Sequence, residues 1–533
     1  MLRRDRANTV QGERGLHSGL VVTLLALIFS ASGVAYGSEP ALITAAKNQD
    51  IVAVRLLLAD GADPDTRQAD GATALHWAVY RNNHDIVAAL INTGTDVNSV
   101  NRLGASALYL AAKVGEAELI ERLLDAGADP NLALPMGETL LMTAARSGTA
   151  EGVRFLVLAG ADVNAKEDSR EQTALMWAAA QGHVEVVRVL IESGADLNAH
   201  SRVRPMLMYT DATNGGAFDQ GVMENLGGYS PLLFAARRGD VGISRQLINA
   251  GADIDGVAGN GTSPLVVATH SRHSELARFL LEQGADTNAS GAGYTAMHAA
   301  ILRGDLDTVE ALLDHGADPD ARLLKSNPVQ RASEDWAFKT SQIGSTPYFL
   351  AASFREATIM RALVEGGANP QLTNEAVWSR PRERADRDSY TPKIIGGYDS
   401  TLQAAIKGDS TRDRYYVQAN PDPAAEEQLA LAAVTAAIDH GVNLNHSDYT
   451  DSTALHDAAL RGLPNIIREL AKRGADINTL NGRRQTPLDL AIAAEGRPNF
   501  FGFDTTISGQ SAREVLEEFG ALRAEQLIDP SEL

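Results

Sequence analysis

The sequence predicts an all-α repeat solenoid, in which short pairs of helices recur along the chain and stack on one another. Glycines that end the units recur at a fixed period, since Gly61, Gly94, Gly127 and Gly160 stand 33 residues apart. A Thr/Ser–Ala/Pro–Leu phrase keeps a constant phase to these glycines. The composition agrees, because 44% hydrophobic residues with only 5% aromatics suit many short helices that pack through small side chains.

Each recurring glycine is usually followed by a small residue and then by Asp or Asn. This short pattern, the finger phrase, marks about 12 units. Most successive intervals are close to 33 residues, and the longer ones equal that period plus an insertion. The glycines are Gly61, Gly94, Gly127, Gly160, Gly194, Gly251, Gly284, Gly316, Gly367, Gly441, Gly474 and Gly520.

One unit, Gly71–Leu103, shows how the pattern specifies structure. Thr73 is placed to cap a first helix that runs to about Tyr80. A second helix over Asp85–Asn92 carries an apolar face, and Gly94 ends it where a positive φ is usually needed. The chain then enters a hairpin, or finger, that leads to the next unit. A single unit cannot bury both helices, so neighbouring units must stack.

The second phrase identifies the family that the chain resembles. It occurs as Thr73-Ala-Leu-His76, Thr295-Ala-Met-His298 and Thr453-Ala-Leu-His456, and with proline as Thr486-Pro-Leu-Asp489. These are similar to the Thr-Pro-Leu-His signature of ankyrin repeats, and the resemblance covers about Glu39 to Ala524. It implies a monomeric protein-binding scaffold with no catalytic activity and no cofactor, whose partners bind through a concave face made of first helices and fingers.

Residues 1–37 have the pattern of a signal peptide. Arg3, Arg4, Arg6 and Arg14 form a basic segment before the apolar run Leu20–Phe29, and Ala35-Tyr36-Gly37 fits a small-x-small cleavage site. We expect cleavage after Gly37 and a periplasmic or secreted protein. An uncleaved anchor is the alternative. No later stretch is apolar for long enough to span a bilayer, so we expect no membrane insertion after cleavage.

The domain boundaries follow from the repeat phase. We expect a first block over residues 38–375, with insertions at about 200–227 and 323–343. An insertion over 376–397 precedes a second block and C-terminal cap over 398–524, and a tail covers 525–533. These insertions follow the finger phrase and should extend the fingers. Two others, at 409–424 and 495–511, fall between the helices of a unit. The array could bend near 376–397.

Charge and cysteine content exclude several functions. The formal net charge of −21 makes nucleic acid an unfavourable partner, because an acidic surface repels phosphates. A basic or locally positive protein is a better partner, although the charge also serves solubility. The absence of cysteine excludes disulfides, thiolate metal sites and cysteine nucleophiles.

The residues that most often carry chemistry follow the repeat phase, which indicates structural roles. His76, His298 and His456 occupy the fourth place of the second phrase, where ankyrin proteins use the ring to join adjacent hairpins. His270 and His273 lack the surroundings of a zinc site. The hairpin aspartates also recur in phase, and no phosphate-binding loop or nucleophile motif is present. We expect no metal site and no catalytic residue.

The insertions hold aromatic and methionine residues, including Met206, Met208, Met223, Trp336 and Phe338. These should pack on the array or on a partner. On the array itself, the resemblance implies a partner-binding row on the first helices. The residues are Trp77, Tyr80, Arg81, Tyr109, Lys113, Arg146, Trp177, Gln181, Phe234, Arg237 and Arg238. For Trp77, Trp177 and Phe234, packing on a neighbouring helix is the alternative.

Two functions follow from these observations. The first is an exported scaffold that holds a partner protein. The second is a subunit that regulates or protects a specific exported enzyme.

Overall fold

A computed structural model describes residues 39–209, 221–325, 338, 342–374, 377–380, 393–408, 423–495 and 510–528. These residues form two compact units. The first unit reaches to Ala111 and includes Asp125–Ala128, and the second holds Ala112–Leu124 and the chain from Asp129 onward. The possible bend near residues 376–397 lies inside the second unit. The predicted signal peptide lies outside the described residues.

The described residues contain twelve helix pairs, which confirms the all-α repeat solenoid. The first helices of the pairs are α2 (Ala41–Lys47), α4 (Ala74–Tyr80), α6 (Ala107–Val114), α8 (Leu140–Ser147), α10 (Ala174–Gln181), α12 (Pro231–Arg238), α14 (Pro264–His270), α16 (Ala296–Arg303), α18 (Pro347–Ser353), α20 (Thr401–Lys407), α23 (Ala454–Arg461) and α25 (Pro487–Ala494). The second helices are α3 (Ile51–Ala59), α5 (His84–Asn92), α7 (Ala117–Asp125), α9 (Ala150–Leu158), α11 (Val184–Glu192), α13 (Val241–Asn249), α15 (Ser274–Glu282), α17 (Leu306–Asp314), α19 (Ala357–Glu365), α22 (Pro423–Asp439), α24 (Pro464–Lys472) and α26 (Ala512–Glu518).

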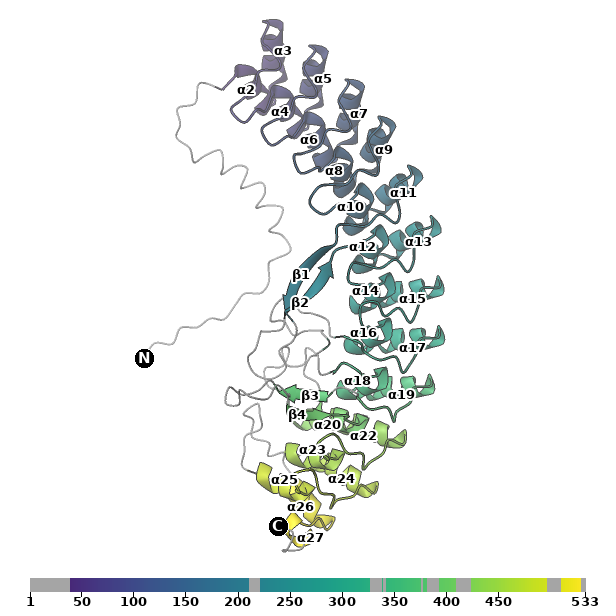
Figure 1. Ribbon diagram of the computed structural model, residues 1–533. Coiled ribbons are helices and arrows are strands. Elements are labelled where there is room, and N and C mark those ends of the chain that lie inside the picture. The colour runs from purple at the N-terminus through teal and green to yellow at the C-terminus, as the bar shows by residue number, and fades with distance from the viewer. Residues whose placement is uncertain are drawn as a thin grey trace, which may run out of the picture. The chain divides into compact units, whose positions relative to one another are not determined.

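In the second unit, the first helices from α8 onward form one layer and the second helices form another (Figure 1). Each first helix packs on the next first helix and on its own second helix, as α10 does on α8, α12 and α11. A short helix, α27 (Ala524–Leu527), follows α26. The array therefore ends in one helix more than the single closing helix that the sequence indicated. None of the helices in the described ranges is long and apolar enough to cross a bilayer.

The helix ends have the caps that the second phrase predicts. Thr73 and His76 form a capping box at the start of α4, in which Thr73 N–H donates to His76 Nδ1 over 3.2 Å. Nε2 of the same ring lies 3.0 Å from the carbonyl oxygen of Ala105. His456 caps its helix and contacts the carbonyl oxygen of Gln485 in the same way, so His76 and His456 join their units to the next finger as predicted. His298 caps α16, but its Nε2 makes no hydrogen bond within the described residues.

A hydrogen-bond ladder along the fingers keeps the register of the repeats. Asp162 Oδ1 accepts from Asn164 N–H over 2.9 Å, which closes the local turn. Asn164 Oδ1 in turn accepts from the N–H of Asp196 in the next unit over 2.7 Å. The other predicted hairpin aspartates make the same local bond, which confirms their structural role: Asp63, Asp129, Asp196, Asp253, Asp286, Asp318 and Asp476.

This ladder continues across the insertions. Asn198 Oδ1 accepts from Asp253 N–H over 2.8 Å, although 55 residues separate the two. Asp320 and Asn369 are joined in the same way at 2.9 Å. The inserted segments therefore leave the repeats in direct contact.

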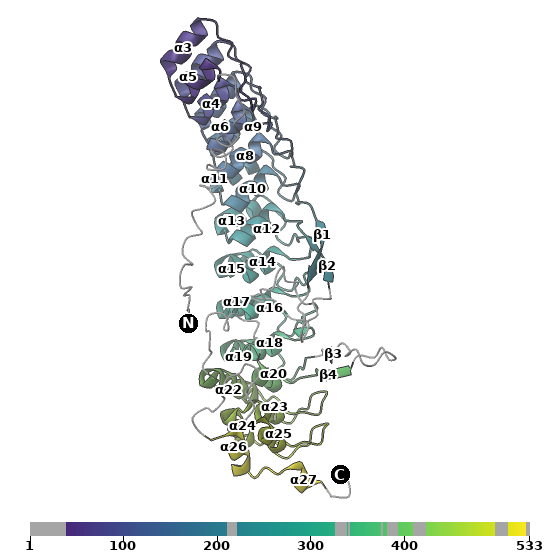
Figure 2. The same cartoon turned by 90° about the vertical axis from the view of Figure 1, so that its left-hand side faces the viewer.

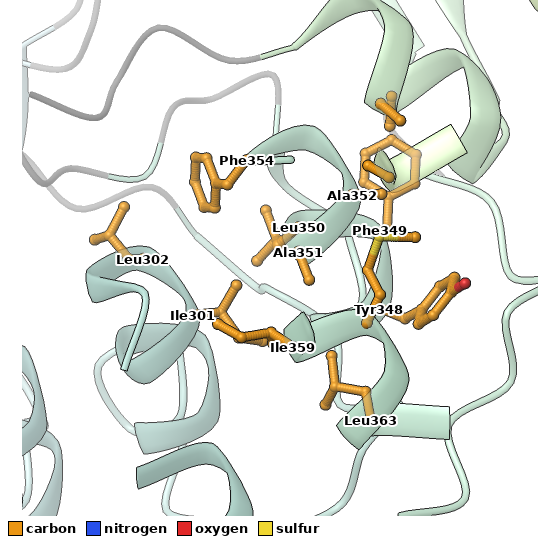
Figure 3. Close-up of a cluster of buried hydrophobic side chains, with 14 of the residues drawn as sticks. Ile301, Leu302, Tyr348, Phe349, Leu350, Ala351, Ala352, Phe354, Ile359 and Leu363 are labelled. Carbon is orange, nitrogen blue, oxygen red and sulfur yellow. The ribbon is translucent and has the colours of Figure 1, made fainter. Parts of the chain in front are cut away.

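The core of the second unit is a continuous apolar cluster from Leu233 on α12 to Ala521 beyond α26. Figure 3 shows one section, where Ile301 of α16 faces α18 and Ile359 and Leu363 reach the same cluster from α19. Tyr348 is only 1% exposed. Because α18 packs on α20 and α20 on α23, the core crosses the insertion at 376–397 without a break.

Two insertions contain antiparallel β-hairpins on the finger side (Figure 2). Strands β1 (Arg204–Tyr209) and β2 (Gly221–Leu226) pair in the first, and β3 (Val377–Arg380) and β4 (Lys393–Gly397) pair in another. In the first hairpin Glu224 is buried and lies 3.2 Å from Lys325 Nζ. The finger side is therefore extended by these two insertions, as predicted.

The aromatic residues of the insertions lie mostly outside the described residues, and Phe338 is one that the structure places. Its side chain is fully buried. Its ring centre lies 5.2 Å from that of Tyr294 and 6.3 Å from that of His298. Of the two interpretations given to these residues, packing on the array therefore holds for Phe338.

Candidate interaction face on the first helices

Within the second unit, helices α8, α10 and α12 each turn residues to solvent, and we call these residues together the first-helix face, whereas all seven residues of α18 are buried. On α12 the stripe is Phe234, Arg237 and Arg238, which are separated by three and four positions and so share one side of a helix. Leu232, Leu233, Ala235 and Ala236 of the same helix are buried against its neighbours. Burial on the other sides therefore determines which residues a partner can reach.

The residues predicted from the sequence divide between the two units. Trp77, Tyr80, Arg81 and Tyr109 belong to the first unit, and Lys113, Arg146, Trp177, Gln181, Phe234, Arg237 and Arg238 belong to the second. The structure exposes Tyr80, Arg81, Lys113, Arg146, Gln181, Arg237 and Arg238, and it half-buries Trp77, Tyr109, Trp177 and Phe234. The aromatic rings other than Tyr80 therefore serve packing at least in part.

In the first unit, Trp77 links three elements. Its indole N–H donates to Gln68 Oε1 over 3.2 Å, and the ammonium of Lys47 on α2 lies 4.5 Å above the ring. Tyr80 meets the same ring edge-on at 5.8 Å between centroids. These contacts fix the ring and leave the outer edge of Tyr80, which is 47% exposed, together with Arg81, available to a partner.

In the second unit, Arg146 of α8 is held in place from two sides. Its guanidinium lies 4.8 Å from the ring centre of Trp177 on α10 and 3.0 Å from Glu138. The side chain is still 40% exposed. This pair repeats the arrangement of Lys47 and Trp77, in which the last cation of one first helix covers the aromatic residue of the next.

The ends of α8, α10 and α12 are joined by residues from their neighbours. His183 Nε2 lies 3.0 Å from the backbone oxygen of Arg146, and His273 Nε2 lies 3.1 Å from that of Arg237. The guanidinium of Arg238 covers Gly182, where even a Cβ atom would be only 2.3 Å from its Nε. These contacts order the backbone beneath the exposed arginines.

From α8 to α20 the first helices carry basic but no acidic residues, although the whole chain is acidic and the later first helices α23 and α25 contain Asp457 and Asp489. Helices α8, α10, α12, α14, α16, α18 and α20 contain no Asp or Glu, and four of them carry Arg or Lys in the last turn. Acidic residues begin the second helices instead, as Glu151, Glu185, Glu275 and Asp307 do. Cations near a helix C-terminus and anions near a helix N-terminus interact favourably with the helix dipole and so stabilise the helix.

A buried charge cluster around Lys407 was missed by the sequence interpretation. Lys407 Nζ lies 2.8 Å from Asp399, 3.5 Å from Asp448 and 3.4 Å from Asp457. Burial lowers the pKa of this ammonium, but Asp457 and Asp399 outweigh that effect and raise it above its ordinary value. Burial raises the pKa of Asp457. The four residues come from two consecutive units, with up to 58 positions between Asp399 and Asp457, so no local sequence pattern brings them together.

The buried histidines are neutral structural groups. Burial lowers the pKa of His298 to about 4, and it also lowers the pKa of His76 and His456. Within the described residues no group of three or more His, Asp or Glu side chains is arranged to hold a metal ion.

Comparison with known families agrees with this geometry. A model of ankyrin repeats in three copies matches residues 21–101, 42–133, 108–201, 214–291, 232–323 and 290–374. A second model, of ankyrin repeats in many copies, matches residues 438–491. The chain belongs to the ankyrin-repeat family. Ankyrin repeats generally bind other proteins, which supports a role as a protein–protein interaction scaffold.

Individual relatives match parts of the chain. Human ankyrin repeat and SOCS box protein 16 is 33% identical over 244 residues, which cover 45% of this chain and 49% of that protein. The E3 ubiquitin-protein ligase KEG of Arabidopsis thaliana is 26% identical over 321 residues, or 55% of this chain and 20% of that protein. An ankyrin repeat-containing protein of Treponema pallidum is 38% identical over 90 residues, 16% of this chain and 30% of that protein. The chain spans less than half of each relative.

Proposed function

We propose that this protein is an exported scaffold that holds a partner protein on its first-helix face. One observation carries the proposal. The predicted arginines Arg146, Arg237 and Arg238 of the second unit are exposed, and contacts between repeats fix the backbone at Arg146 and Arg237. A rigid surface with exposed arginines beside half-buried aromatic rings has residue types that are enriched in protein interfaces.

Export is proposed on the sequence pattern of residues 1–37. A basic segment, an apolar run and a small-x-small site are the three parts of a secretory signal. N-terminal sequencing of the protein isolated from the cell exterior or periplasm should give Ser38 as the first residue. Recovery of a chain that begins at Met1 from the cytoplasmic fraction would contradict export.

The binding role is tested by affinity capture with three baits. The first bait is the native chain, the second has Arg146, Arg237 and Arg238 changed to Gln, and the third has Arg154 and Arg278 changed to Gln. The last two arginines lie exposed on the second helices α9 and α15. We expect one dominant partner that is retained by the native and third baits and lost by the second. A partner retained equally by all three would place binding elsewhere on the molecule.

The same capture separates the scaffold from the alternative, a subunit that regulates or protects an exported enzyme. A captured enzyme whose activity or lifetime changes when the scaffold is added would establish the alternative. A captured protein whose properties are unchanged supports a scaffold.

A further inference from the structure

We propose that the first-helix face over α8, α10 and α12 binds an extended acidic segment whose carboxylates lie about six residues apart. This inference rests on the proposed function and specifies the chemistry of the partner at that face. The observation behind it is the distribution of charge. Arg146, Arg237 and Arg238 are exposed there, and the three helices contain no acidic residue.

The arginines of this segment differ in availability from those further along the array. Arg237 and Arg238 are exposed and form no ion pair with any other described residue. By contrast, Arg303 at the end of α16 donates through Nε to the carbonyl oxygen of His270 over 2.6 Å. Arg355, just after α18, lies 2.7 Å from Glu426. Arg237 and Arg238 are therefore more available to a partner than Arg303 and Arg355 are.

Arg146 completes this region although it already has an intramolecular partner. Its contacts with Trp177 and Glu138 fix the direction of the guanidinium and leave its side chain 40% exposed. A guanidinium has five N–H donors, so a single contact with Glu138 leaves donors for a second carboxylate. A fixed arginine also loses less side-chain entropy on binding than a free one.

The acidity of the whole chain does not prevent this binding. Charges separated by more than the Debye length, about 8 Å at physiological salt, are largely screened. Asp240 stands only two residues after Arg238, but its carboxylate caps α13 by accepting the N–H of Ile243 over 2.9 Å. On the neighbouring fingers, Asp162 and Asp196 already accept backbone N–H donors. These carboxylates are therefore already hydrogen-bonded, and none of them forms an ion pair with Arg237 or Arg238 among the described residues.

The geometry of the repeats determines how far apart the carboxylates of the bound segment should stand. Packed helices lie about 8–10 Å apart, and an extended chain advances about 3.3 Å per residue, so one repeat corresponds to about three residues. Helix α10 packs directly on both α8 and α12, so Arg146 and the Arg237–Arg238 pair are two repeats apart, or about six residues. Gln181 lies on the repeat between them. The segment should therefore carry an uncharged polar residue halfway between its carboxylates.

The test is fluorescence anisotropy of labelled peptides with the full chain. One peptide places two Glu-Glu pairs about six residues apart in a Gly/Ser background, and its isomer of equal composition places them about three apart. We expect the first peptide to bind about tenfold more tightly than its isomer, with an affinity that falls as salt rises. Arg237→Gln with Arg238→Gln should weaken its binding about tenfold, and Arg237→Lys with Arg238→Lys should retain most of it.

The matched control is Arg154→Gln with Arg278→Gln, which removes the same charge from the second helices and should leave the affinity unchanged. Circular dichroism of each variant checks that the helices are intact. Equal affinity for the two isomers, or an equal loss in the control variant, would overturn the inference. If the capture experiment finds a partner on the first-helix face but neither acidic peptide binds, the acidic segment is wrong and the scaffold function stands.

Discussion

Replacing Lys407 by Met should lower the local stability of the array where α20 packs on α23. Lys407 is the cation closest to Asp399, Asp448 and Asp457, within 3.5 Å of each. Removing one member of a buried ion pair costs about 3–5 kcal/mol, because the remaining charge is left buried without compensation. The Lys407 side chain is 26% exposed and partly hydrated, so we expect the lower end, about 3 kcal/mol.

Hydrogen exchange is the suitable assay, because a repeat array opens locally and a single unfolding free energy is poorly defined. A loss of about 3 kcal/mol corresponds to roughly 150-fold faster exchange of the amides that open at this position. Peptides that cover 399–408 and 448–461 should show it, and those from α8 and α10 should not. The control is Lys472→Met on α24, an exposed lysine, which should leave the exchange unchanged.

Two further measurements separate charge from packing. Asp457→Asn in the Lys407→Met background should recover part of the loss, because it removes one of the uncompensated carboxylates. Acidification should also recover part of it. Burial raises the pKa of Asp457 and Lys407 opposes that effect, so without Lys407 the folded state binds a proton at Asp457 more readily than the unfolded state and gains stability as the pH falls. Native exchange rates in Lys407→Met would refute the argument.

Three other predictions concern the buried core. Leu455→Ala should lower the free energy of unfolding in urea by about 2–5 kcal/mol, because Leu455 is 1% exposed. Leu460→Ala, on the same helix and 54% exposed, should change the free energy little. Equal effects of the two substitutions would contradict the assigned helix faces. Phe338→Ala should cost about 3 kcal/mol by removing the ring that packs on Tyr294 and His298, measured as faster exchange in α16, and native rates would contradict that packing. Because burial lowers the pKa of His298 to about 4, the folded state binds fewer protons than the unfolded state below about pH 6.5, and stability should fall by about 2 kcal/mol between pH 7 and 5. A His298→Gln variant should lack this part of the pH dependence, and an unchanged dependence would refute the assignment to His298.

The repeats were predictable because their signals are local. Thr73 and His76 are three residues apart, and their capping box follows from helix geometry alone. The finger aspartates bond an amide two residues away, so their periodic recurrence identifies their role. The exposed arginines of the first-helix face could also be located from the sequence, since helix periodicity places them opposite the buried residues.

The contacts that the sequence did not predict join residues far apart in the chain. Lys407 meets Asp448 and Asp457 only after α20 and α23 stack across an insertion. Glu224 of β2 meets Lys325 across 101 positions. No period connects such residues, because their proximity depends on how each insertion folds back on the array. The half-burial of Trp177 similarly depends on the position of Arg146 in the preceding repeat.

The central claim is that a partner protein binds the first-helix face, and hydrogen exchange of the complex with the captured partner tests it most directly. We predict slower exchange in the peptides that cover the exposed turns of α8, α10 and α12 when the partner is added. The second helices α9, α11 and α13 should exchange at the rates of the free protein. Protection confined to the second helices, with no change on the first, would contradict the account.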